Sequence, residues 1–154
     1  MSVPPSPFKL RHRILTRYGE ADMQSVIFNA RYLDYADLAI SVYWKRMGMD
    51  LFGDTMLSFH VANANIDFKQ PIRPFELIDL CCVTERIGTT SLTTLIELRS
   101  AADGGEGDLR ASIRIVHVSV DMETHRPRAI SDDVKQLVSD FDNRAEVLLT
   151  GERD

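Results

Sequence analysis

Cysteine, positive charge and long apolar stretches are all scarce in this chain of 154 residues. Its two cysteines, Cys81 and Cys82, are neighbours in an apolar run, where a strand would point their side chains to opposite faces. We therefore expect two buried free thiols and no disulfide. The four histidines are scattered along the sequence, and no spacing of cysteine or histidine suits a structural metal site, so we expect no bound metal.

The charge balance and the hydropathy pattern narrow the class of protein. The chain has 18 lysine and arginine residues against 23 aspartate and glutamate residues, which gives a formal net charge of −5. This sign disfavours binding to a phosphate backbone, so we expect no nucleic-acid partner. The proline-rich start lacks the apolar core of a signal peptide, and no run reaches the roughly 18 apolar residues of a membrane span. We expect a single cytoplasmic domain without a membrane span.

Apolar residues occupy most of the helical wheel over Asn29–Met47, which predicts a long helix enclosed on most sides. Its polar stripe is thin and recurs at spacings of 3, 4 and 4: Asp34, Asp37, Ser41 and Lys45. Gly48 follows the last apolar residue, and glycine is common just after a helix C-terminus. A helix this apolar in a small domain requires a sheet around it.

Strand-like segments before and after that helix supply the sheet. The segments are Lys9–Arg17, Leu57–Phe68, Leu77–Arg86, Leu92–Ser100 and Leu109–Asp121. Within the second and the last of these segments, the apolar residues move from one face of the strand to the other. This change indicates a bulge, or a strand that is buried on both faces. We infer that another subunit covers the outer face of the sheet. Ser131–Phe141 is predicted to form a short helix with Ser131 as its N-cap.

The loop that leads into the long helix holds the strongest candidate for chemistry. A helix N-terminus offers unpaired backbone N–H groups and a partial positive charge, which suit an oxygen that gains negative charge during acyl transfer. Asp22 precedes Asn29 by seven residues, and its carboxylate would act as a nucleophile or as a general base for water. From the residues alone, a turn or capping role for Asp22 is the commoner alternative.

The order of residues in this loop resembles the 4-hydroxybenzoyl-CoA thioesterase family of hotdog-fold acyl-CoA thioesterases. The matching motif consists of Tyr18, Asp22, Val26, Ile27, Phe28, Tyr32 and Leu33, with Tyr35 following. The resemblance extends in order over about residues 10–140 and includes Phe68–Pro74, Ile87–Ser91 and Arg126–Arg128.

The resemblance implies an α+β hotdog fold, in which a five-stranded antiparallel sheet wraps around one long central helix. It also implies a homodimer or homotetramer with active sites at the subunit interfaces, acting on an acyl-CoA. The implied domain covers residues 9–141, between a flexible N-terminal segment at 1–8 and a polar C-terminal tail at 142–154.

The same resemblance assigns roles to individual residues. Asp22 corresponds to the catalytic carboxylate, the backbone N–H of Asn29 to the group that polarises the thioester carbonyl, and Tyr18 to the catalytic set. Phe28 and Tyr32 would contact the substrate. Coenzyme A is then a portion of the substrate, so no cofactor is expected.

Three positions depart from the family pattern. Ser25 replaces the usual glycine, Asn29 the usual histidine or tyrosine, and Arg31 the usual asparagine. Ser25 restricts backbone conformations that glycine permits, and Asn29 cannot carry a proton near neutral pH. Two alternatives therefore stay open beside hydrolysis: a hotdog domain that binds acyl-CoA or another thioester without cleaving it, and a structural oligomer.

The phosphates of coenzyme A need fixed positive charge at the edge of an otherwise acidic protein. By position, the candidates for binding coenzyme A are Arg86, Thr90, Ser91, Arg126 and Arg128. The alternative is that these arginines are solvated surface residues. His60 and His117 lie in predicted strands and are expected to be core or interface histidines.

Overall fold

The computed structural model describes residues 7–49, 58–143 and 148–150. Leu57, residues 1–6 of the predicted N-terminal segment and most of the predicted C-terminal tail lie outside these ranges. In chain order the elements are β1 (Leu10–Leu15), η1 (Tyr18–Glu20, a single 3₁₀ turn), α1 (Arg31–Met47), β2 (Phe59–Phe68), β3 (Leu77–Ile87), β4 (Ser91–Ser100), β5 (Leu109–Ser119), α2 (Asp132–Asp142) and β6 (Leu148–Thr150).

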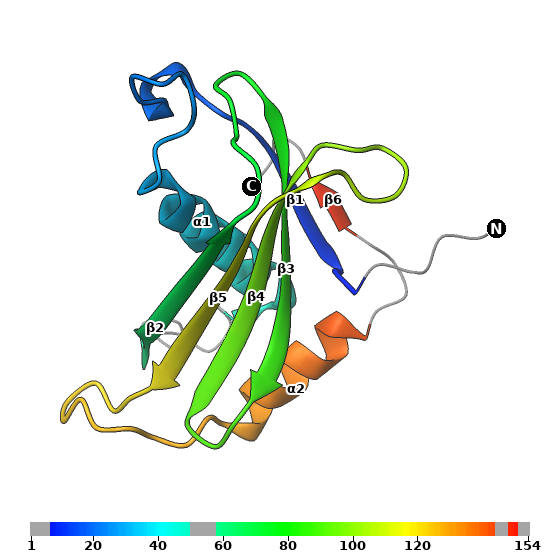
Figure 1. The fold of residues 1–154 in the computed structure, drawn as a ribbon. Helices are drawn as coiled ribbons and strands as arrows, with labels where there is room; N and C mark the ends of the chain where they lie inside the picture. Colours follow the sequence, from blue (N-terminus) through cyan, green and yellow to red (C-terminus); the bar gives the residue numbers. More distant parts are fainter. Residues whose placement is uncertain (1–6, 50–57, 144–147, 151–154) are drawn as a thin grey trace.

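The strands form one sheet in the order β2-β5-β4-β3-β1-β6, and the sheet curves around α1 (Figure 1). The first five strands in this order are antiparallel to their neighbours. This confirms the predicted hotdog architecture of a five-stranded antiparallel sheet around one long helix. The sixth strand, β6, pairs in parallel with β1 and was not predicted, because three residues in a polar tail carry no pattern of their own.

Helix α1 lies in the core as its apolar wheel predicts. Nine of its side chains are buried: Tyr32, Tyr35, Ala36, Ala39, Ile40, Val42, Tyr43, Trp44 and Met47. The four residues of the polar stripe are exposed. Gly48 ends the helix with φ 92°, a left-handed conformation that glycine adopts without a steric penalty. The helix begins at Arg31, two residues later than predicted, because Asn29 and Ala30 form a turn.

Helix α2 packs on the core beside β3 and confirms the predicted short helix. The Ser131 hydroxyl accepts a hydrogen bond from the Val134 N–H at 3.3 Å, so Ser131 is the N-cap. At the other end, the Asp142 carboxylate accepts the hydroxyl proton of Tyr43 at 2.8 Å. The ring of Phe141 packs edge-on against Tyr43, with the centroids 5.5 Å apart. These contacts tie α2 to α1.

The irregularity predicted within residues 57–68 is confirmed in β2, whereas the buried positions of β5 do not change phase where predicted. The inward positions of β5 alternate regularly, but β2 has a register shift between Val61 and Asn63, opposite His117 and Val116. Strand β5 has one extra residue, Arg110, because its neighbours Leu109 and Ala111 pair with the consecutive residues Arg99 and Leu98 of β4. Bulges of this kind turn a side chain away from the regular strand direction.

Both cysteines are buried free thiols, as predicted. Burial raises the pKa of Cys81 to about 12 and that of Cys82 well above its usual value, so both stay protonated at neutral pH. His117 is buried against Trp44, with ring centroids 4.9 Å apart. His60 is exposed on the edge strand β2, so of the two predicted places, core or interface, the core is excluded and the interface stays a prediction.

The described residues contain no helix long and apolar enough to cross a membrane. In the same residues, no three histidine, cysteine, aspartate or glutamate side chains are grouped as metal ligands. Phe8, placed by sequence in the flexible segment, is buried.

Candidate functional site

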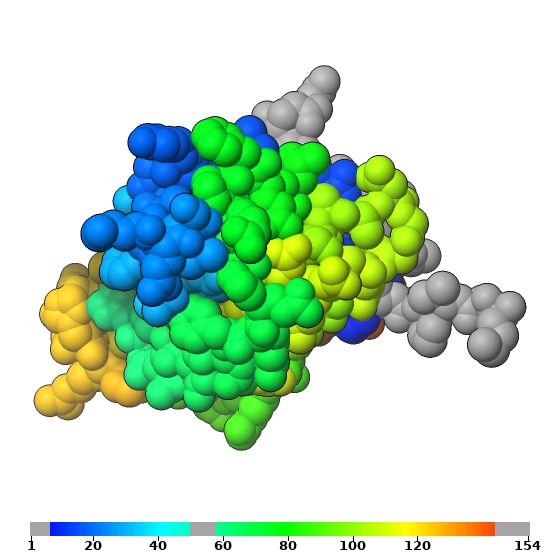
Figure 2. Space-filling view, turned by 45° about the horizontal axis from the view of Figure 1, so that its top comes forward, coloured from blue at the N-terminus to red at the C-terminus, as the bar shows by residue number. Residues whose placement is uncertain are grey.

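The loop before α1 is closed at its base by backbone hydrogen bonds. The Phe28 N–H donates to the Glu20 carbonyl at 2.9 Å, and Ala21 and Ile27 form an isolated β-bridge. The Ile27 N–H donates to the carbonyl of Ile72 at 2.7 Å, which joins the loop to the segment between β2 and β3. Figure 2 shows this loop in blue beside the green segment that follows β2. Two segments far apart in sequence therefore form one surface.

Glu20 anchors this loop and was missed by sequence reasoning. Its carboxylate is buried and accepts hydrogen bonds from the Tyr35 hydroxyl at 2.9 Å and from the Arg17 N–H at 2.8 Å. Burial by itself would raise the pKa of Glu20, but the hydrogen bonds from Arg17 and Tyr35 outweigh it and lower the pKa below its usual value. The carboxylate is thus charged at neutral pH and holds the loop against α1. No sequence signal distinguished it from other loop acids.

Asp22 lies within the closed loop, where it makes local hydrogen bonds. Its carboxylate accepts the Gln24 N–H at 2.8 Å, and its own N–H donates to the Val26 carbonyl at 2.9 Å. Ser25 has φ 63°, the left-handed conformation that a glycine at this family position adopts freely. The turn role weighed for Asp22 is therefore present, and its side chain stays partly accessible.

A groove of about 370 Å³ opens beside the first turn of α1. It is lined by Val26, Ile27, Asn29, Tyr32, Phe68, Lys69, Gln70 and Pro71. Within the described part of the chain, the backbone N–H of Asn29 has no hydrogen-bond acceptor. Burial raises the pKa of Tyr32, whose ring packs edge-on against Phe68 with centroids 4.9 Å apart. The groove combines apolar walls with an unpaired donor.

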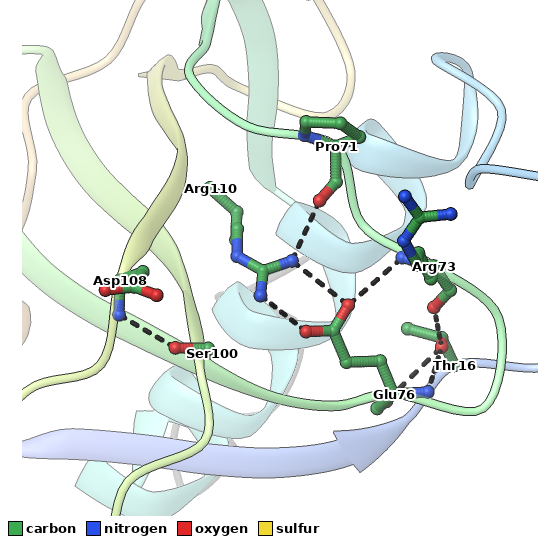
Figure 3. Close-up of polar contacts among 7 residues, drawn as sticks. All are labelled: Thr16, Pro71, Arg73, Glu76, Ser100, Asp108 and Arg110. Atoms are coloured by element: carbon green, nitrogen blue, oxygen red, sulfur yellow. Dashed lines mark hydrogen bonds and ion pairs between the residues drawn. The ribbon is translucent and has the colours of Figure 1, made fainter.

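A second groove of about 470 Å³ continues from the first, since Gln70 and Pro71 line both. Here Arg110, turned by its bulge, forms a two-point ion pair with Glu76 and donates to the Pro71 carbonyl at 2.8 Å (Figure 3). Glu76 also accepts the Arg73 N–H at 3.1 Å. Burial favours a raised pKa for Glu76, but its hydrogen bonds and the positive charge of Arg110 and Arg73 lower it.

The other predicted site residues occupy two places. Tyr18 and Phe28 are exposed on the same loop as Asp22, but neither lines the first groove. The residues proposed for coenzyme A lie at the opposite end of the sheet: Arg86, Thr90, Ser91, Arg126 and Arg128. There the Ser119 N–H donates to the Thr90 carbonyl, and the Arg128 N–H donates to the Ser119 carbonyl. The structure brings these five together but leaves them far from Asn29.

The geometry near Asn29 suits an acyl group. The apolar walls accept a hydrocarbon or an aromatic ring, and Asn29, whose backbone N–H is unpaired among the described residues, lines the same groove. Asp22 is not among the lining residues of this groove, but its backbone N–H donates to the carbonyl of Val26, which is one of them. The missed residues of this region, Arg73, Glu76 and Arg110, had no signal in the sequence beyond the position of Phe68–Pro74 in the family resemblance.

Comparisons with known proteins agree with this fold. A thioesterase complexed with coenzyme A and zinc from Thermus thermophilus is similar in structure, with a TM-score of 0.78 and 22% identity, covering 91% of this chain and 98% of that one. A 1,4-dihydroxy-2-naphthoyl-CoA thioesterase from Synechocystis has a TM-score of 0.76 and 13% identity, covering 87% and 98%. A predicted thioesterase from Bacillus stearothermophilus has a TM-score of 0.75 and 23% identity, covering 86% and 95%.

A search of curated proteins found no match. The profile of the thioesterase-like superfamily matches residues 16–138, which include the loop with Asp22, the whole of α1 and the strands β2 to β5. The match covers most of the chain, so the chain belongs to the thioesterase-like superfamily and is a thioester hydrolase.

Proposed function

We propose that this protein hydrolyses acyl-CoA thioesters in the groove beside Asn29, with Asp22 as the catalytic carboxylate. The observation that carries the proposal is the unpaired Asn29 N–H at the start of α1, which opens onto an apolar groove. An acyl chain or ring lies along Tyr32 and Phe68, and the thioester carbonyl oxygen accepts the hydrogen bond from Asn29.

The Asn29 N–H stabilises the negative charge that develops on the thioester carbonyl oxygen. When water or a carboxylate attacks the thioester carbonyl carbon, the carbonyl oxygen becomes negative. A backbone donor already pointing at that oxygen stabilises the transition state without reorganisation, and losing one such donor typically costs about 10²–10³ in kcat. The helix dipole at the start of α1 adds to this effect. The Asn29 side chain has no required part in this role.

Asp22 supplies the attacking oxygen or activates the water that does. As a general base it takes a proton from water, the water oxygen bonds to the carbonyl carbon, and the carbon–sulfur bond breaks. The thiolate of coenzyme A then takes up the proton, and the free acid leaves. Either role requires a carboxylate that the substrate or water can reach, and the side chain of Asp22 is partly accessible. The loop is held in place by Glu20, whose hydrogen bonds to Arg17 and Tyr35 fix its base.

A second copy of the chain completes the site in this proposal. The arginines suggested for coenzyme A lie at the other end of the sheet from Asn29, so they reach a groove only in another subunit. The exposed edge strand β2, with Val61 61% and Phe68 50% exposed, supports an oligomer, because an unpaired apolar edge favours pairing with another strand.

The test is thiol release from a panel of acyl-CoAs, running from acetyl-CoA through long-chain to aromatic acyl groups. We expect hydrolysis of one class and little signal from an enzyme-only blank, because Cys81 and Cys82 are buried. The preferred class identifies the acyl group that the groove accepts. Absence of release from every member of the panel by the folded protein contradicts the proposal.

A further inference from the structure

The second groove contains a cation with no partner. Among the described residues, the guanidinium of Arg73 makes no hydrogen bond or ion pair, whereas both terminal nitrogens of Arg110 donate to Glu76 or Pro71. Figure 3 shows the Arg73 guanidinium pointing away from that ion pair. The charge of Glu76 is neutralised by Arg110, so it offers little repulsion to an incoming anion. The fixed charge left for a ligand is that of Arg73.

An exposed aromatic ring lies on the same groove. Phe75 is 67% exposed and has φ 63°, a conformation that bulky side chains rarely adopt. Thr16 holds it there: the Phe75 N–H donates to the Thr16 carbonyl at 2.9 Å, and the Thr16 hydroxyl donates to the Arg73 carbonyl at 2.6 Å. The fold thus keeps an apolar ring at the surface against local backbone preference.

A second exposed ring lies beside it. Tyr18 is 79% exposed, and its ring is inclined by 28° to that of Phe75 with the centroids 6.5 Å apart. This separation is at the wide end of the range for aromatic pairs, about 4.5–7 Å. Both side chains are exposed, and exposed side chains change rotamer within nanoseconds. A flat group therefore has space to enter between the rings or to stack on either one.

We propose that the second groove, with the ring of Tyr18 beside it, binds a flat, negatively charged ring group of the thioester substrate, with the ring on Tyr18 and Phe75 and the anion on Arg73. The proposal rests on the proposed function, because this groove continues from the one beside Asn29 through Gln70 and Pro71. Two parts of a substrate have this chemistry: the phosphorylated adenosine of coenzyme A, and an aromatic acyl group that carries a carboxylate.

Equilibrium binding tests this without any hydrolysis. Isothermal titration calorimetry is carried out with two probes, adenosine 3′,5′-bisphosphate and the benzene dicarboxylate terephthalate. We expect one probe to bind, with an affinity about tenfold weaker in Arg73→Gln and about tenfold weaker in Phe75→Ala. The control variants Lys135→Gln and Met122→Ala remove a cation and an exposed apolar side chain elsewhere, and they should bind as the unmodified chain does.

The outcomes separate this site from the proposed function. Binding of the bisphosphate identifies the nucleotide as the occupant, and binding of terephthalate identifies the acyl group. If neither probe binds, or if both site variants bind as the controls do, the proposal is wrong. A change of oligomeric state in Phe75→Ala by sedimentation, without an effect on the probes, also overturns it, since a second copy then covers the ring. Probe binding through Arg73 in a chain that releases no thiol would instead contradict the proposed hydrolysis.

Discussion

The two ends of the sheet differ in how their functional residues are held. At the end near Asn29, irregular segments carry Ser25 and Phe75 at positive φ, and two grooves lie between them and the sheet. At the far end, Arg86 and Arg128 are exposed beside the β3–β4 turn, within a backbone hydrogen-bond network. Positive φ occurs at both ends, since His125 beside the far arginines has φ 58°. The two ends differ in that the near end has two grooves and the far end has exposed cations.

This difference bears on how Asp22 and the arginines proposed for coenzyme A are distributed over the chain. Strand β3 starts next to the near grooves and ends next to Arg86, and its length of 11 residues corresponds to roughly 30 Å at about 3.3 Å per residue. One chain therefore does not bring Asp22 and the far arginines to the same ligand. In the proposed arrangement, a chain would supply Arg73 to its own groove, and Arg86, Arg126 and Arg128 to the groove of a second copy.

The largest expected effect tests the near end directly. Asp22→Asn removes the negative charge but keeps the shape and the hydrogen bond from Gln24, so kcat should fall by about 10²–10⁴. Urea unfolding should be unchanged, because the loop is held by Glu20. The control Asp37→Asn neutralises an exposed acid on α1 and should keep full turnover. An unchanged kcat in Asp22→Asn would show that the carboxylate of Asp22 takes no part in the reaction.

The next effect concerns stability in the part of the sheet toward the far end, where His117 lies buried. Burial lowers the pKa of His117 to about 4, so between pH 6.5 and 4 the unfolded state binds more protons than the folded state. Stability should fall on acidification through this window, by about 3 kcal/mol between pH 7 and 4. Urea unfolding of His117→Leu should not show this loss of stability between pH 7 and 4. The control His60→Asn, at an exposed histidine, should show it in full. Equal pH dependence in all three proteins would contradict a neutral buried imidazole.

A smaller effect decides whether the two ends act together. The combined variant Arg86→Gln, Arg126→Gln and Arg128→Gln should raise KM for acyl-CoA by about 10–100-fold. Mixing it with Asp22→Asn, after dissociation and reassembly, should return activity to about a quarter of the sites if each site takes its carboxylate and its arginines from different subunits. No recovery on mixing, with the triple variant still impaired, would mean that both ends act within one chain.

The smallest effect measures the strain of the near end. Ser25→Gly should raise the free energy of unfolding by about 0.5–1 kcal/mol, because glycine adopts φ 63° without the penalty that serine carries. The same substitution at Ser139 in α2 should lower it by ~0.5 kcal/mol, because glycine is a poor helix residue. Chemical denaturation of the two variants checks the opposite signs. A loss of stability in Ser25→Gly would show that the loop is not strained at this residue.

Sequence reasoning succeeded where one segment carries its own pattern. The apolar wheel of residues 29–47 and the stop at Gly48 predicted α1, and Ser131 marked the start of α2. It did not decide between core and interface for His60, because edge position is a property of the whole sheet. It missed Glu20 because its burial depends on Tyr35, 15 residues further along the chain. For the site, the position of Asp22 in its loop followed from the motif, while its hydrogen bond to Gln24 did not.

The sequence by itself determined the long helix, the five strand segments and the buried thiols, because each depends on the spacing of apolar residues within one stretch of chain. The antiparallel arrangement followed from the family resemblance. Only the tertiary structure decided that residues 20–28 lie against Ile72, that the bulge turns Arg110 toward Glu76, and that the far arginines lie at the other end of β3. These features depend on strand register and on contacts between distant segments. Such contacts form only when the sheet closes around α1, so no local pattern records them.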